Sequence, residues 1–180
     1  STKFNGGELI AISDRGTKSN LVFNWHYATD TSFHYTTSTS GSTFLQTTFT
    51  PHSDSNRHLI MATVNGAAND DASGVLERYS GGSWGTDDNL RGASGPGGSG
   101  NFRGSFGDWS SVRSSSMEDK QTAQFTAIYV YDFPSGVTGY RVRYTCENTG
   151  GLYMNRPRGS DGGYNTNTSR STLVVLELAN

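Results

Sequence analysis

Apolar residues in this chain recur in short runs in which hydrophobic and polar side chains alternate. From residue 140 to 147, Tyr140, Val142, Tyr144 and Cys146 occupy every second position, and charged or polar residues fill the positions between them. Alternation with a period of two is typical of a β-strand with one buried face. The 3.6-residue period of an amphipathic helix is missing from almost the whole chain, so we predict an all-β protein.

Turn-forming residues separate these runs at short intervals, as in antiparallel sandwiches and barrels. A length of 180 residues suits one domain with a single core. We therefore predict an antiparallel β-sandwich over residues 1–180, with an aromatic N-terminal segment at 1–40. The predicted strands are Glu8–Ser13, Leu21–Ala28, Phe44–Thr50, His58–Asn65, Gly74–Tyr79, Ala123–Phe133, Tyr140–Glu147, Leu152–Arg156 and Ser171–Ala179.

The last predicted strand is apolar on both faces over Leu173, Val174, Val175 and Leu176. Such a strand is expected to lie centrally, buried between two layers or at a subunit interface. Only 32% of the residues are hydrophobic, so the chain has a limited core of its own. Contacts between subunits would add burial, and we predict a homotrimer or a higher assembly with these residues in the interface.

A long segment rich in glycine and serine, residues 80–121, separates the predicted strands and is expected to form a surface loop. Its GPGGSG sequence at 95–100 has the letters of a dinucleotide-binding turn, but the strand and the helix that such a turn requires do not flank it. We interpret the glycines as flexible points in a loop that presents aromatic side chains. The aromatic residues predicted to contact a ligand or partner are Trp84, Phe102, Phe106, Trp109, Tyr153 and Tyr164.

Composition and charge narrow the classes of partner. The net charge is −2 and basic residues are not in surplus, which argues against a nucleic-acid partner. No apolar run approaches about 18 residues and no signal-peptide pattern opens the chain, so membrane insertion is not expected. The single cysteine, Cys146, excludes an intrachain disulfide and a cysteine-based zinc site. We interpret Cys146 as a buried structural thiol, and we expect neither a metal nor a cofactor.

Several motifs that look catalytic have simpler interpretations. The G-x-S-x-G pattern at 81–85 would need a helix and a histidine after Ser83, but every histidine of the chain precedes it. The stretch Pro51–Asn56 has the residues of a tight turn, and we predict a hairpin there. His26 and His34, with Asp30 between them, lack the spacing of a metal site, so a structural or interface role is favoured.

The stretch Asn155-Arg156-Pro157-Arg158 is predicted to end a strand, because proline removes a donor from the ladder. The side chains of Asn155 and Arg156 could then tie the emerging loop to backbone carbonyl groups. A solvated strand end is the alternative.

Four blocks of the chain, in order and spacing, resemble fibre, knob and decoration proteins of marine tailed bacteriophages. The blocks are Thr47–Gly66, Tyr140–Tyr144, Gly150–Arg156 and Ser169–Ala179. The resemblance covers roughly residues 44–179 and implies a jelly-roll-like sandwich, often trimeric, on the virion surface. It brings no catalytic residues, and this chain departs from the group in segment 80–121 and in residues 1–40.

We therefore expect a non-enzymatic structural protein of a phage virion surface, such as a fibre knob, head fibre or capsid decoration. Its expected partners are other copies of itself, other virion proteins and a glycan of the host surface. An alternative is a lectin-like carbohydrate-binding module outside a virus. A third possibility, a glycan-cleaving enzyme, needs two carboxylates about 5–10 Å apart, and no spacing singles out a pair among Asp108, Glu118, Asp119 and Asp132.

Overall fold

The computed structural model of the chain consists of two antiparallel β-sheets. The structure describes residues 22–68, 72–90, 123–132, 134–146, 151–155 and 169–178. The strands of the first sheet are β1 (Val22–Asp30), β2 (His34–Thr36), β4 (Arg57–Ala68), β7 (Ala123–Tyr131), β9 (Leu152–Met154) and β10 (Ser171–Leu178). The strands of the second sheet are β3 (Ser42–Thr48), β5 (Ala72–Ser80), β6 (Ser83–Thr86) and β8 (Val137–Cys146). One short 3-10 helix, η1 (Asp88–Leu90), follows β6.

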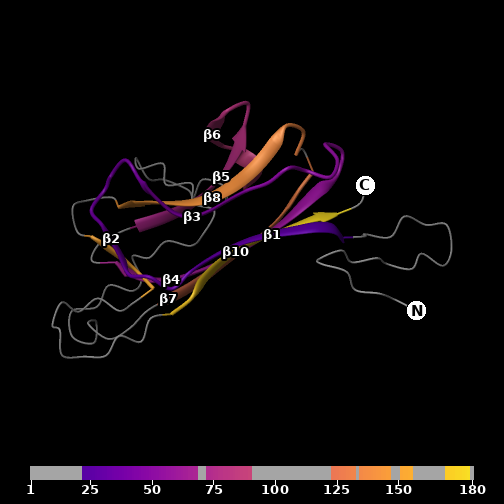
Figure 1. The fold of residues 1–180 in the computed structure, drawn as a ribbon. Coiled ribbons are helices and arrows are strands. Elements are labelled where there is room, and N and C mark those ends of the chain that lie inside the picture. The colour runs from indigo at the N-terminus through magenta and orange to yellow at the C-terminus, as the bar shows by residue number, and fades with distance from the viewer. Residues whose placement is uncertain are drawn as a thin grey trace, which may run out of the picture.

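The first sheet is arranged around β4, which is its longest strand. One edge of β4 pairs with β7, and the other edge pairs first with β10 and then with β9. β1 and β2 extend the sheet by pairing with β10 and β9 respectively. The longer strands of this sheet therefore lie in the order β1-β10-β4-β7, and they form one layer of the molecule in Figure 1.

The second sheet has the order β3-β8-β5-β6 and forms the other layer. β5 and β6 are joined by Gly81 and Gly82, whose φ angles are 59° and 82°. Two consecutive positive φ values are typical of the type I′ turn that closes a two-residue hairpin. Ser83, the central residue of the G-x-S-x-G pattern, pairs with Ser80 across this hairpin. It is not at the strand-to-helix turn that a nucleophile elbow requires.

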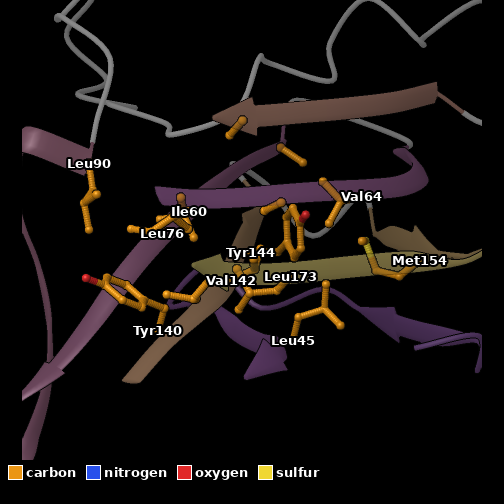
Figure 2. Close-up of a cluster of buried hydrophobic side chains, with 14 of the residues drawn as sticks. Leu45, Ile60, Val64, Leu76, Leu90, Tyr140, Val142, Tyr144, Met154 and Leu173 are labelled. Atoms are coloured by element: carbon orange, nitrogen blue, oxygen red, sulfur yellow. The ribbon is translucent and has the colours of Figure 1, made fainter. Parts of the chain in front are cut away.

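The core lies between the two sheets and is filled by alternate residues of both. Figure 2 shows side chains from the two layers pointing toward one another, with Tyr140 and Met154 toward opposite ends of the cluster. Tyr140, Val142, Tyr144 and Cys146 of β8 are all buried, as their alternation predicts, so the predicted burial of the Cys146 thiol is confirmed. The other fully buried large apolar side chains are Ile60, Leu76, Leu90, Leu152, Met154, Leu173 and Val64.

The predicted all-β, antiparallel fold is confirmed for the described residues, and the architecture is compatible with a β-sandwich. Eight of the predicted strands correspond to observed ones, while Glu8–Ser13 lies outside the described residues. β2 and β6 were not predicted, because runs of three or four residues are too short to show alternation. Segment 80–121 therefore begins with a strand and a 3-10 turn, and its residues 91–121 lie outside the described part.

The predicted hairpin at Pro51–Asn56 is wrong. The segment does turn, with the Asn56 amide donating to the Ser53 carbonyl oxygen at 3.1 Å, but it joins β3 of the second sheet to β4 of the first. Turn-forming residues specify a change of chain direction, and they do not specify whether the next strand returns to the same sheet. Within the described ranges, the chain forms no helix long and apolar enough to cross a membrane.

Candidate functional site

The outer face of the first sheet, which points away from the second sheet, carries an extended uncharged surface. In β1, β10, β4 and β7, residues that alternate with core residues point outward. The strand register aligns them in rows across the four strands. The rows are Trp25, Leu176, Leu59 and Val130; Tyr27, Val174, Met61 and Ile128; and Thr29, Thr172, Thr63 and Thr126. We call these residues the uncharged face.

The margins of the uncharged face are the most exposed. On β7, Ile128 is 63% exposed and Val130 51%, while on β1 Tyr27 is 57% exposed and Trp25 43%. The rings of Trp25 and Tyr27 stack on each other with their centroids 5.0 Å apart. Contiguous apolar surface of this kind usually marks an interaction site, and its central side chains on β4 and β10 are half-buried.

The structure divides the predicted interface residues between two environments. Leu173 and Val175 are fully buried in the core between the sheets, so their prediction as interface residues is wrong. Val174 and Leu176 point outward into the uncharged face, where the interface prediction still applies. An apolar run on both faces predicts that both sides of β10 are covered. It does not show which residues face the core of the chain and which face outward.

Sequence reasoning missed most of the uncharged face, although the pattern contains it. β4 reads His-Leu-Ile-Met-Ala from residue 58, and β7 reads Ala-Ile-Tyr-Val-Tyr from residue 127. Both runs are apolar at odd and even positions, as β10 is. Three neighbouring strands that are apolar on both faces indicate a second buried or interacting surface.

A cluster of aromatic side chains lies farther along the same face. Tyr153 pairs with Tyr35 across β9 and β2, and its ring contacts those of Tyr35 and Phe33 at centroid distances of 4.9 Å and 6.4 Å. Phe33 and Tyr35 are exposed. Gly151 lies directly against Tyr35, since a Cβ atom there would be 2.7 Å from the ring. Tyr153, a predicted contact residue, is therefore part of an exposed aromatic surface.

The outer face of the second sheet is charged instead. Glu77 is 4% exposed and lies between two arginines, with its carboxylate oxygens 2.6 Å from Nε of Arg141 and 2.8 Å from Nε of Arg143. The Arg141 guanidinium covers the ring of Trp84, and the Tyr79 ring packs against the same indole. Trp84, predicted to contact a ligand, thus has contacts with its own sheet.

A chain of polar groups crosses one end of the core. Glu177 is fully buried, and its carboxylate accepts from the His52 amide at 2.7 Å and lies 3.0 Å from Nε2 of His26. The buried His58 ring places Nδ1 2.7 Å from the Tyr140 hydroxyl oxygen. No cluster of three ligating side chains that could hold a metal occurs in the part of the chain that the structure describes. The contact of His58 with Tyr140 joins β4 of the first sheet to β8 of the second, and the contacts of Glu177 join β10 to β1 and to the segment before β4.

Stability is expected to fall by about 2 kcal/mol between pH 7 and pH 5 because of His58. Burial lowers the pKa of this histidine from 6.5 to about 4. The charge of Glu177 opposes this shift, and His26 lowers the pKa by a smaller amount. Its contribution to stability is therefore complete above pH 6.5 and is lost as the pH falls toward 4, since the unfolded chain binds the proton first.

Urea unfolding at pH 7 and pH 5 measures this loss. The His58→Phe variant should show a smaller loss over the same interval. Equal pH dependence in His58→Phe would contradict the assignment.

The remaining predicted residues are only partly described. Phe102, Phe106, Trp109 and Tyr164 lie outside the described residues, as do Asp108, Glu118 and Asp119. Asp132 is half-exposed and is 4.0 Å from the Arg57 guanidinium. The contact predictions for these residues therefore stay predictions.

The exposed chemistry on the described part of the chain is an uncharged sheet face, an aromatic cluster beside it and a charged face on the opposite side. Comparison with models of known protein families and with curated protein sequences finds no match to this chain.

Proposed function

We propose that this chain is a non-enzymatic structural protein of a bacteriophage virion surface, such as a fibre knob, a head fibre or a capsid decoration. The observation that carries the proposal is the order in which the longer strands pair. It supports a jelly roll, the fold that the sequence resemblance implies, and jelly rolls are common in viral capsid proteins.

The pairing follows from rolling up one long hairpin. Among the described strands, with the short β2 and β9 left aside, the first pairs with the last (β1 with β10) and the second with the seventh (β3 with β8). The third pairs with the sixth (β4 with β7) and the fourth with the fifth (β5 with β6). Curling this hairpin brings β10 beside β4 and β8 beside β5. Each of these neighbours is antiparallel, as a rolled hairpin requires.

The proposed protein works by assembling with itself, as a homotrimer or a higher assembly, and by attaching to other virion proteins. A rigid two-sheet scaffold suits this role because the loops at its ends are free to vary. The uncharged face supports self-association, since exposed apolar surface of this extent favours a protein contact. Contact with a host-surface glycan is a further part of the proposal.

Labelling of virions with an antibody to this chain tests the location. We expect label on the head or the tail of intact particles of the phage that encodes it, and particles without this gene product provide the control. Absence of label from intact particles, with the protein present only in the soluble fraction of the lysate, would contradict the proposal.

A lectin-like carbohydrate-binding module is the second candidate, and the exposed aromatic cluster favours it. Aromatic faces bind the apolar faces of sugar rings, and Phe33, Tyr35 and Tyr153 present such rings together. A glycan array with the isolated protein, compared with the Tyr153→Ala variant, tests this function. Binding that Tyr153→Ala abolishes, together with unlabelled virions, would favour the lectin over the virion protein.

A further inference from the structure

We propose that copies of this chain assemble through the uncharged face, with the faces of neighbouring copies packed against one another. This inference rests on the self-assembly in the proposed function but is independent of where the protein is located. It identifies the contacting surface as the β1-β10-β4-β7 sheet and the occupant as another copy of the same sheet.

The charge pattern of the two sheets identifies the partner. The outer face of the second sheet carries the charged side chains Glu77, Arg141 and Arg143, whereas the rows of the uncharged face consist of aliphatic, aromatic and threonine side chains. A partner with charged groups at the centre of its surface would bury them there without counter-ions, which is strongly unfavourable. A matching partner must be flat, apolar and uncharged. Each copy of this chain carries such a surface.

The size of the face is sufficient for a specific contact. Four strands spaced by about 4.8 Å and rows separated by about 6.8 Å cover roughly 400 Å² per copy once side-chain width is included. The relief of the side chains and the adjoining cluster of Phe33, Tyr35 and Tyr153 enlarge the accessible area. Two such faces together cover roughly 800 Å², and with the adjoining aromatic cluster they approach the roughly 1,000 Å² at which specific interfaces begin.

The distribution of residue types also fits an interface. Trp25 and Tyr27 form a stacked pair at one margin of the face, and tryptophan and tyrosine are among the residue types that contribute most to binding at interfaces. Threonines provide hydroxyl groups that can bond across the contact, as Thr63 and Thr126 do within the sheet at 3.3 Å. The charged residues Arg57 and Asp132 lie beyond the row of Leu59 and Val130, at the rim, where interfaces are polar.

Sedimentation of the full chain over a range of concentrations tests the proposal. We expect a species of at least twice the 19.4 kDa of one chain at micromolar concentration. The variant Ile128→Glu should shift dissociation to a concentration about 100-fold higher, because the new charge would be buried and unpaired in the assembly. Its fold should persist, since Ile128 is 63% exposed in the single chain. Tyr27→Glu should act in the same way from the opposite margin of the face.

The matched control is Gln46→Glu, which places the same charge at an exposed strand position on the second sheet, in register with Arg141. This substitution should leave the number of chains in the assembly unchanged. A wild-type monomer at every concentration would overturn both the inference and the proposed self-assembly. An assembly that survives Ile128→Glu and Tyr27→Glu would overturn the inference alone.

A wild-type monomer that assembles only after deletion of residues 1–20 would also overturn the inference, because the uncharged face would then be covered by the chain's own N-terminal segment.

Discussion

Replacing Asn155 by alanine is expected to lower the free energy of unfolding by about 4 kcal/mol. This residue is fully buried between β9 and β10. Its side-chain Nδ2 donates to the carbonyl oxygens of Asp30 at 3.1 Å and Ser32 at 2.9 Å, and its Oδ1 accepts from the Ser171 hydroxyl at 2.6 Å. Alanine would remove all three bonds and leave buried groups without partners, each at a cost of about 1–3 kcal/mol where water cannot replace them.

The backbone of Asn155 adds to the expected effect. Its φ of 62° lies in the left-handed region, which asparagine tolerates better than alanine does. Chemical unfolding of Asn155→Gly and Asn155→Ala separates the two causes. Glycine relieves the backbone strain but restores no hydrogen bond, so it should recover only about 1 kcal/mol of the loss. A loss below about 1 kcal/mol in Asn155→Ala would contradict the role of its side chain.

Replacing Leu90 by alanine is expected to cost about 3–4 kcal/mol. Leu90 is fully buried in the core although it lies at the end of η1, beyond the last strand of the β5–β6 hairpin. Its position is maintained by Asp87, whose carboxylate accepts from Arg78 at 2.9 Å and from the Tyr131 hydroxyl at 2.7 Å. The substitution would leave a cavity in a well-packed core.

A matched variant separates core packing from local structure. Leu90→Met keeps most of the side-chain volume and should cost less than about 1.5 kcal/mol. Both values come from urea unfolding monitored by circular dichroism. If Leu90→Ala were as stable as Leu90→Met, the segment after β6 would be a passive connection and would not contribute to the core.

The arginine and tyrosine contacts of Asp87 connect this segment to β5 and β7. Burial raises the pKa of the Asp87 carboxyl, but hydrogen bonds from Tyr131, the Asn89 amide and Arg78 outweigh it and lower the pKa. Burial and the bond to Asp87 raise the pKa of Tyr131 to about 12. Asp87 is therefore ionised and Tyr131 neutral at neutral pH, which are the forms that this hydrogen bond needs.

The local pattern of the sequence was sufficient to predict most strands and the side of β8 that is buried. Alternation is a property of neighbouring residues, and a strand places alternate side chains on opposite faces wherever it lies. Of the aromatic residues predicted in segment 80–121, the structure describes Trp84, which packs against Tyr79 and Arg141, and the fully buried residue of the described part is Leu90. An isolated leucine in a polar segment has no periodic neighbours, so no pattern distinguishes it as a core residue.

The sequence by itself determined that this protein is built from antiparallel strands, that β8 buries alternate residues from Tyr140 to Cys146, and that β10 is apolar on both sides. Tertiary structure decided which faces meet. Glu177 reaches His26 across 151 positions of the chain, and the uncharged face joins β1 to β7 only because β10 and β4 lie between them. Strand order arises from long-range pairing, which local alternation does not encode. The same alternating run can therefore face either the core or another molecule, depending on the strands beside it.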